Sequence, residues 1–239
     1  MKEKIKNLLK KFPFFYLLAQ RIWWGISMLK VKILGTRVIE KKWQRNKKNR
    51  DFSNLNYPHR QFLIKRISNF QPFGKILEIG CDYGPNLYLL AKKFPRVKFT
   101  GIDINPLAIK EGRKWFEKEG LTNIELLVGK ADELSKFLDK SFDIVFTDAV
   151  LMYIGQDKIK KLITETARIA KMVLIFIEWH LPDKRKELYD SHIGVWKRDY
   201  LNLFKKYFLQ EKINISKIPK ELWPDENWQK FGYIIEIKL

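Results

Sequence analysis

The 239-residue chain has little cysteine and little histidine, and both shortages limit the chemistry that it can perform. A single cysteine, Cys81, excludes an intramolecular disulfide framework and a cysteine-based zinc cluster, and it favours a reducing, cytosolic compartment. The three histidines, His59, His180 and His192, lack the spacing of metal ligands, so we expect no metal site. With 46% hydrophobic and 31% charged residues, the composition is that of a globular protein.

Acidic residues are also scarce relative to basic ones, since 47 Lys and Arg face 27 Asp and Glu, a net charge of +20. Much of this excess lies in residues 1–50, where 15 Lys and Arg face only Glu3 and Glu40. Such an imbalance indicates a surface for an anionic partner. We therefore predict a basic, amphipathic and aromatic helical arm over residues 1–50 and a single α/β domain over residues 51–239.

The arm lacks the uncharged apolar run of a transmembrane helix. Residues 12–29 reach the necessary length of about 18 residues, but Arg21 lies in the middle, where a charge costs about 2.5–3.5 kcal/mol. A helix lying in the membrane interface fits better, with lysines over anionic headgroups and Trp23 and Trp24 at the acyl boundary. We therefore expect a cytoplasmic protein, peripheral to the inner face of the membrane.

Three other interpretations of the arm stay open. It resembles a signal peptide with a cleavage site after Ala19, although the rest of the chain looks cytosolic. It could be a helical lid or an oligomer contact that buries its aromatic residues in protein. It could also bind nucleic acid, but its aromatic residues form one apolar block instead of alternating with the lysines, which suits bases poorly.

Short apolar segments alternate with amphipathic ones from about residue 57 onward. We predict strands over 75–80, 98–103, 124–128, 142–147 and 172–178, and helices over 58–70, 86–94, 106–119, 132–138, 156–170 and 196–206. Two last strands, over 207–215 and 231–238, have no helix between them. The expected fold is thus α/β, a doubly wound, mostly parallel seven-stranded sheet with an antiparallel edge hairpin and an N-terminal helical extension.

A glycine-containing turn follows the first predicted strand, where KILEIG runs into CDYGPN. Gly80 and Gly84 let the backbone approach a ligand closely, and the next helix offers free N–H groups. Asp103 closes the following strand, 23 residues after Gly80, where a carboxylate can hold both hydroxyls of a ribose. Taken singly, these residues could also be a structural turn and an N-cap before Pro106.

Four blocks, LEIGCDYGPN, GIDINPLAI, GKADEL and FDIVFTDAVLMYI, resemble in order and spacing the class I S-adenosylmethionine-dependent methyltransferases. The resemblance covers about residues 57–180 and implies S-adenosylmethionine as the cofactor. It implies that Asp103 binds the ribose, Asp132 the adenine amino group, and that Asp148 lies on the pocket floor with Leu151. The other implied cofactor-binding residues are Glu78, Gly80 and Gly84 around the methionine moiety, with Cys81, Asp82, Ile104 and Ala131.

Two residues depart from the family pattern. Asp82 stands where the family commonly has glycine, and Tyr153 where many members have histidine. Aspartate tolerates unusual backbone angles, and its carboxylate could face the cofactor's ammonium group. Asp82 also argues against a dinucleotide-dependent oxidoreductase, which requires glycine there, and it leaves a non-catalytic donor-binding subunit open. His59 and Arg60 are expected to close over the cofactor from the amino-terminal side.

The expected catalytic residues are His180, His192 and Glu178. Glu178 and His180 end the fifth predicted strand, and His180 is the leading base because its ordinary pKa lies near neutrality. The alternative is that His180 only hydrogen-bonds the loop. His192 and Arg198 could hold an anionic or hydroxylated acceptor. We expect methyl transfer to a small-molecule, lipid or lipid-linked acceptor at an anionic membrane, with an RNA methyltransferase as the main rival.

Overall fold

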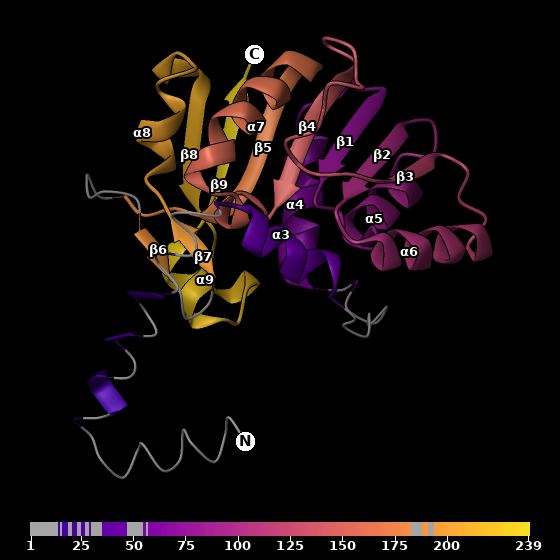
Figure 1. Ribbon diagram of the computed structural model, residues 1–239. Coiled ribbons are helices and arrows are strands. Elements are labelled where there is room, and N and C mark those ends of the chain that lie inside the picture. The colour runs from indigo at the N-terminus through magenta and orange to yellow at the C-terminus, as the bar shows by residue number, and fades with distance from the viewer. Residues whose placement is uncertain are drawn as a thin grey trace.

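A seven-stranded sheet forms the centre of the computed structural model, which describes residues 14, 16–18, 21–22, 25–26, 29, 35–46, 55, 57–182, 188–190 and 194–239 (Figure 1). Its order is β3-β2-β1-β4-β5-β9-β8; the first five strands are parallel, and β9 is antiparallel to both neighbours. The strands are β1 (Lys75–Ile79), β2 (Lys98–Asp103), β3 (Ile124–Val128), β4 (Phe142–Asp148), β5 (Ala170–Trp179), β8 (Ile213–Lys217) and β9 (Gly232–Lys238). The predicted fold class is confirmed.

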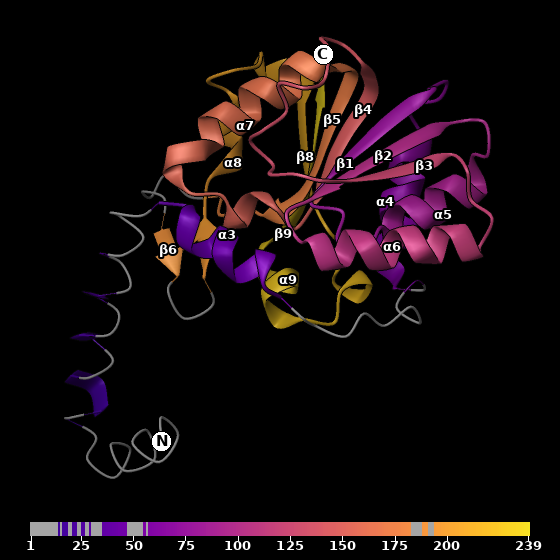
Figure 2. The same ribbon diagram turned by 45° about the vertical axis from the view of Figure 1, so that its right-hand side comes forward.

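Helices cover both faces of this sheet (Figure 2). One face packs against α4 (Pro58–Ser68), α5 (Pro85–Lys93), α6 (Pro106–Lys118) and α9 (Glu226–Phe231). The other packs against α7 (Gln156–Ile169) and α8 (Tyr200–Phe204). Short 3-10 turns complete the chain: η2 (Leu151–Tyr153), η3 (Gln210–Lys212) and η4 (Lys220–Leu222).

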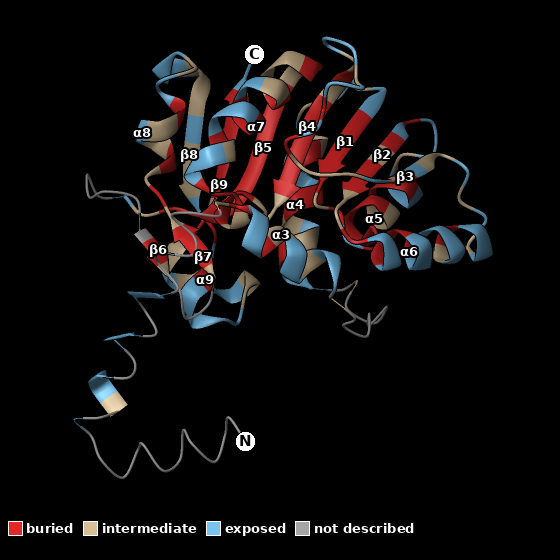
Figure 3. Cartoon of the chain, viewed as in Figure 1, coloured by how far each residue is buried: buried red, intermediate tan, exposed pale blue. Residues whose placement is uncertain are grey.

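The central strands are buried on both faces, as their continuous apolar sequences require (Figure 3). In β5, Val173 and Ile175 point into the core beneath α4–α6, while Leu174 and Phe176 point into the core beneath α7 and α8. All four side chains are fully buried. This two-sided core fixes the register of the sheet and therefore the positions of the strand ends.

A short helix from the predicted arm, α3 (Arg37–Gln44), packs against the α/β domain. Its apolar residues Ile39 and Trp43 are four residues apart and lie on one face. They contact a small separate hairpin formed by β6 (Leu188–Asp190) and β7 (Val195–Lys197) as well as Tyr153. Trp43 and Tyr153 meet edge to face with ring centroids 4.9 Å apart.

The predicted helix over residues 132–138 is wrong, because this segment consists of turns. Its carbonyl groups are bound from the side by Arg168, which donates to Phe137 O at 2.9 Å and to Leu134 O at 3.1 Å. The same guanidinium pairs with Asp139 at 2.6 Å. The side chain of Arg168 thus supplies hydrogen bonds to carbonyl groups that would bind backbone N–H groups in the predicted helix.

The predictions near the C-terminus are also displaced. The helix predicted over 196–206 begins only at Tyr200, because residues 195–197 pair with β6 and Asp199 caps the helix through the N–H of Asn202. Residues 207–208 continue the turn, since both N–H groups donate to Phe204 O. The strand predicted over 207–215 therefore starts at Ile213.

The described residues between 14 and 29 lie away from the sheet in both views (Figures 1 and 2). Six of them are large apolar residues that are exposed: Phe14, Leu17, Leu18, Ile22, Ile26 and Leu29. Within the parts of the chain that the structure describes, no helix combines the length and the apolar character needed to cross a membrane. Trp23 and Trp24, on which the membrane prediction drew, lie outside the described residues.

Candidate cofactor and acceptor site

A cavity of about 510 Å³ opens where the parallel strands end, bounded by the loops after β1, β2, β3 and β4 and by α3. This is the edge at which open α/β sheets bind ligands. Seven of the predicted cofactor-binding residues line it: Gly80, Asp82, Asp103, Ile104, Ala131, Asp132 and Asp148. The remaining lining residues come from α3, the start of α4 and the neighbouring loops, among them Trp43, Tyr57, Arg60, Tyr83, Lys130 and Tyr153.

The turn after β1 needs its glycines. Gly80 has φ 74°, and a Cβ there would lie 2.4 Å from Val150 Cγ2. Gly84 has φ 87° and precedes α5; its Cβ would lie 2.6 Å from Phe116 Cζ. Both conditions exclude a side chain, so the backbone itself forms this wall of the site. Gly80 therefore lines the cavity, whereas Gly84 shapes the turn from behind.

Asp82 takes the backbone conformation that glycine would otherwise supply. Its φ is 49°, in the left-handed region that aspartate tolerates better than most residues. Its N–H donates to Asp103 Oδ2 at 2.9 Å, which ties the glycine turn to the end of β2. The departure from the family pattern thus preserves the geometry of the turn and adds a carboxylate to the cavity wall.

Asp103 is oriented by two backbone donors. Oδ2 accepts from Asp82, and Oδ1 accepts from the N–H of Asn105 at 2.8 Å. The N-cap of α6 is Asn105, whose side chain accepts from Leu107 and Ala108, and not Asp103. A carboxylate oxygen accepts more than one hydrogen bond, so Asp103 keeps acceptor capacity toward the cavity.

A buried polar cluster lies beside the turn. Asn86 donates to Glu78 Oε1 at 2.7 Å and to Asp148 Oδ2 at 3.1 Å, and it accepts from Arg60 at 2.6 Å. Burial raises the pKa of Glu78 well above its ordinary range, although the Asn86 bond opposes the shift. Among the described residues, Glu78 Oε2 and Asp148 Oδ1 have no hydrogen-bond partner.

His59 stands next to this cluster in a column of rings. It stacks on Trp223 with centroids 3.8 Å apart and on Tyr57 at 5.6 Å, and its Nε2 lies 3.9 Å from Asp148 Oδ2. Burial lowers the pKa of His59 to about 4, partly countered by Asp148. His59 is therefore neutral near pH 7. The expectation that Arg60 reaches the cofactor side fits its position in the cavity wall.

Four predicted cofactor-binding residues do not line the cavity. Glu78 accepts a hydrogen bond from Asn86 in the buried cluster, and Gly84 shapes the turn. Cys81 is buried, with its N–H bound to Ile102 O, and Leu151 is buried in η2. These residues support the wall from behind, a difference that the family blocks cannot reveal because lining and supporting residues alternate within them.

The predicted catalytic residues Glu178 and His180 are buried outside the cavity lining. Glu178 accepts hydrogen bonds from Thr147 Oγ1 and from the N–H groups of residues 150–152. Burial raises the pKa of Glu178 to about 7 against these bonds. His180 Nδ1 accepts from the N–H of Tyr200 at 3.1 Å. The alternative role for His180, hydrogen bonding within the loop, fits this contact, and His192 lies outside the described residues.

The residues that sequence reasoning missed come mainly from α3 and the residues that flank it: Ile39, Glu40 and Trp43 in the helix, Thr36 before it and Asn46 after it. The available signal was the spacing of Ile39 and Trp43, two apolar residues four apart in a largely polar segment. The boundary between arm and domain at residue 50 stays a prediction, but α3 contributes to the site from the arm's side. Of the alternatives for the arm, a lid suits this segment.

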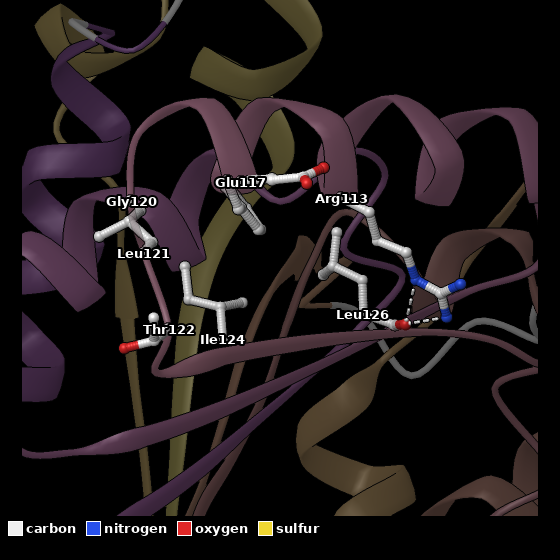
Figure 4. Close-up of a pocket in the computed structure, with 8 residues that line it drawn as sticks. Arg113, Glu117, Gly120, Leu121, Thr122, Ile124 and Leu126 are labelled. Carbon is white, nitrogen blue, oxygen red and sulfur yellow. Dashed lines mark hydrogen bonds between the residues drawn. The ribbon is translucent and has the colours of Figure 1, made fainter.

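A second, smaller cavity of about 320 Å³ lies away from the strand ends, between the C-terminal half of α6 and β3 (Figure 4). Its wall is largely apolar, and at one end Arg113 donates two hydrogen bonds to Leu126 O. It brings together none of the predicted site residues, so the first cavity is the candidate functional site.

The residues of the first cavity fit S-adenosylmethionine. The turn at Gly80 offers a backbone surface without side chains, Asp103 faces the cavity with acceptor capacity, and Asp148 Oδ1 is a buried acceptor that lacks a partner among the described residues. Fold and site together define a Rossmann-like protein that binds a nucleoside-containing cofactor at the carboxyl edge of its sheet.

Comparison with known proteins agrees with this class. Residues 76–172 match the methyltransferase domain family, so this part of the chain is a methyltransferase domain of the S-adenosylmethionine-dependent type. It is 26% identical over 135 residues to a malonyl-[acyl-carrier protein] O-methyltransferase of Priestia megaterium, covering 54% of this chain and 47% of that protein. It is 33% identical over 98 residues to a tRNA (guanine-N(7)-)-methyltransferase of Christiangramia forsetii, covering 36% of this chain and 43% of that protein.

The fold is similar to that of geranyl diphosphate C-methyltransferase from Streptomyces coelicolor, solved with S-adenosyl-L-homocysteine. The TM-score is 0.62 at 12% identity, over 85% of this chain and 97% of that one. The chain spans less than half the length of either curated relative. These proteins have different acceptors, so the likeness shows the fold and leaves the acceptor open.

Proposed function

We propose that this protein transfers a methyl group from S-adenosylmethionine to a small-molecule, lipid or lipid-linked acceptor at an anionic membrane surface, on the cytoplasmic side. The observation that carries the donor assignment is the hydrogen bond from the Asp82 N–H in the glycine turn to the Asp103 carboxylate. This bond joins the two segments of the cavity wall that would hold a nucleoside. Calorimetry with the purified protein tests it directly: S-adenosylmethionine should bind, and NADH should not.

The charge of the cavity wall suits this donor, which when bound supplies a methyl group on a cationic sulfonium. Five carboxylates line the cavity, Glu40, Asp82, Asp103, Asp132 and Asp148, and they outnumber Arg60 and Lys130 in the wall together with Lys158, which pairs with Glu40 and Asp132. A negative, partly desolvated wall attracts a cation and holds it less strongly once the positive charge is lost. This charge pattern favours binding of the donor over the neutral-sulfur product.

The site supports catalysis by positioning more than by a histidine base. Methyl transfer is an in-line displacement, so alignment of donor and acceptor supplies much of the rate. Glu178 and His180 are engaged by backbone N–H groups away from the cavity. The acceptor would be oriented by groups that do line the cavity, such as Tyr153 and the Asp148 carboxylate.

The membrane part of the proposal is supported by the arm. Phe14, Leu18, Ile22 and Ile26 recur every four residues and are exposed, Phe14 to 73%. A stripe of this spacing lies along one side of a helix. Residues 1–50 carry 15 basic residues, and each one near an anionic surface contributes about 1 kcal/mol. An exposed apolar stripe in a basic segment is typical of an interfacial helix.

Two truncations separate the arm's roles. Removal of residues 1–34 keeps α3 and should abolish flotation with vesicles containing anionic lipid while leaving donor affinity within about twofold. Removal of residues 1–50 deletes α3 as well and should also lower the affinity for S-adenosylmethionine. Flotation of the 35–239 protein at the wild-type level would exclude the arm as the membrane-binding element.

A second candidate is RNA methylation, favoured by the same basic arm and by the similarity to a tRNA methyltransferase. In that case the full-length protein should ignore anionic vesicles and shift RNA in gels, with an affinity that falls steeply as salt rises. Flotation and gel shift on the same preparation choose between the two acceptor classes.

A further inference from the structure

Three charged side chains connect the N-terminal segment to the donor cavity. Lys158 of α7 donates to Glu40 of α3 in a short ion pair and to Asp132 Oδ1 at 3.2 Å. All three are largely shielded from solvent, with side-chain exposures of 20% for Lys158, 12% for Glu40 and 9% for Asp132. Such pairs are screened less by solvent and salt than surface pairs.

Lys158 stays charged in this setting. Burial alone would lower the pKa of Lys158, but hydrogen bonds to Glu40 and Asp132 outweigh burial and raise it above the ordinary value. A permanently charged ammonium between two carboxylates fixes all three groups, because neither carboxylate can move without leaving part of a charge unpaired.

The geometry leaves one side of Asp132 for a ligand. Oδ1 is bound by Lys158, whereas Lys161 lies 4.0 Å from Oδ2, beyond hydrogen-bond distance. Glu40 and Asp132 both line the cavity. Lys158 therefore fixes the rotation of the Asp132 carboxylate and directs Oδ2 as an acceptor.

Further contacts fasten α3 to the loops of the same cavity. Thr36 donates through its N–H and Oγ1 to the Asp157 carboxylate and accepts from the N–H of Gly155 at 2.7 Å. At the other end, Asn46 O accepts from Asn105 Nδ2 at 2.8 Å, two residues after Asp103. The helix thus spans the cavity from the loop after β4 to the loop after β2.

From these contacts we infer that α3 is part of the donor-binding site and that Glu40 is a positioning residue, which acts through Lys158 to hold Asp132 for the adenine amino group. The inference rests on the proposed function, because it requires S-adenosylmethionine as the donor. It assigns to the N-terminal segment a share in donor recognition, in addition to any role at a membrane.

A comparison of two ligands tests this inference. S-Inosylhomocysteine differs from S-adenosylhomocysteine in carrying a carbonyl in place of the 6-amino group, so its 6-position accepts hydrogen bonds and cannot donate one to Asp132. Wild-type protein should bind the adenosyl compound at least tenfold more tightly. Glu40→Gln should weaken the adenosyl compound about fivefold to tenfold and leave the inosyl compound unchanged, because only the adenosyl compound uses the Asp132 contact.

Lys158→Gln should show the same ligand-selective loss, while Glu211→Gln, an exposed change in η3, should bind both ligands as wild type does. Thermal unfolding of each variant confirms that it is folded. An equal loss for both ligands would overturn the positioning role and leave Glu40 with only a structural role in closing the cavity. No loss in either variant would also overturn it. Failure of the wild type to bind either ligand would instead refute the proposed function.

Discussion

Glu178 and Arg198 bind the N–H groups and the carbonyl groups, respectively, of the same turn, residues 150–154 around η2. The Glu178 carboxylate accepts from the N–H groups of residues 150–152, and the Arg198 guanidinium donates to the carbonyls of Leu151 and Ile154. Both side chains are almost fully buried. This turn presents Val150 and Tyr153 to the cavity. The end of β5 therefore shapes the site without touching it.

Replacing Glu178 by Gln should destabilise the protein. The amide has one acceptor oxygen, and its NH₂ group would face backbone N–H groups that now donate to a carboxylate. We expect the free energy of unfolding in urea to fall by about 2–4 kcal/mol, the range for disrupting buried charge-assisted bonds. The exposed Glu211→Gln should match wild type. Wild-type stability combined with lost turnover would return Glu178 to a catalytic role.

His59 should make the protein sensitive to mild acid. Its folded pKa of about 4 lies below its ordinary 6.5, so the neutral form is favoured in the fold. This contribution is present above pH 6.5 and is lost as pH falls toward 4, by up to about 3 kcal/mol. The charged groups that influence it are Asp148 from β4 and Arg60 on its own helix. His59→Phe keeps a ring against Trp223 and should reduce the dependence of the free energy of unfolding in urea on pH between 6.5 and 4. The same pH dependence in the variant as in the wild type would show that His59 is not the group responsible.

Gly80 and Gly120 form a matched pair for testing the turn. Both have positive φ, 74° and 66°, but a Cβ at Gly80 meets Val150 whereas a Cβ at Gly120 has no neighbour within 4 Å. Gly120→Ala should cost about 1 kcal/mol for the backbone alone. Gly80→Ala should cost about 1–3 kcal/mol more because of overpacking, and Val150→Ala should restore part of the loss in the double variant. Equal melting temperatures would show that Val150 moves aside.

Asp103→Ala should weaken donor binding. Loss of a charge-assisted hydrogen bond to the ribose costs at least about 1.4 kcal/mol, a tenfold rise in Kd by calorimetry. Because Asp103 also accepts from the turn at Asp82, Asp103→Asn serves as the control: it keeps the shape and should fall between wild type and alanine. Unchanged affinity in both variants would place the ribose elsewhere in the cavity.

The sequence predicted the sheet well because its signal is local. Continuous apolar runs such as residues 172–178 have to be strands buried on both faces, and Gly80 with Asp103 follows from the chemistry of a βαβ unit. The helix expected over 132–138 failed for a non-local reason, since Arg168 reaches across to bind its carbonyls. The pairing of strands can be predicted from the sequence. The side chain that binds the carbonyl groups of a loop cannot, because it comes from a distant part of the chain.

The same limit applies to the site. Residues at strand ends, such as Asp148, line the cavity because topology brings strand ends together, and this much follows from the sequence. The sequence could not distinguish His180, whose ring accepts from a backbone N–H, from a residue that faces the cavity. It also could not place α3, because docking of that helix depends on partners more than 100 residues away, Asp157 and Lys158.

The two hydrogen bonds from Arg113 to the Leu126 carbonyl have a consequence for association between molecules. In the parallel pairing of β2 and β3, odd residues of β3 bond to β2, as Asn123 O does to Phe99, so the Leu126 carbonyl points to the open side of the sheet. An unpaired edge of this kind recruits strands from other chains. Since Arg113 already donates twice to that carbonyl, an incoming strand would have to displace a guanidinium first. One helix side chain thus obstructs the addition of a strand at the β3 edge of the sheet.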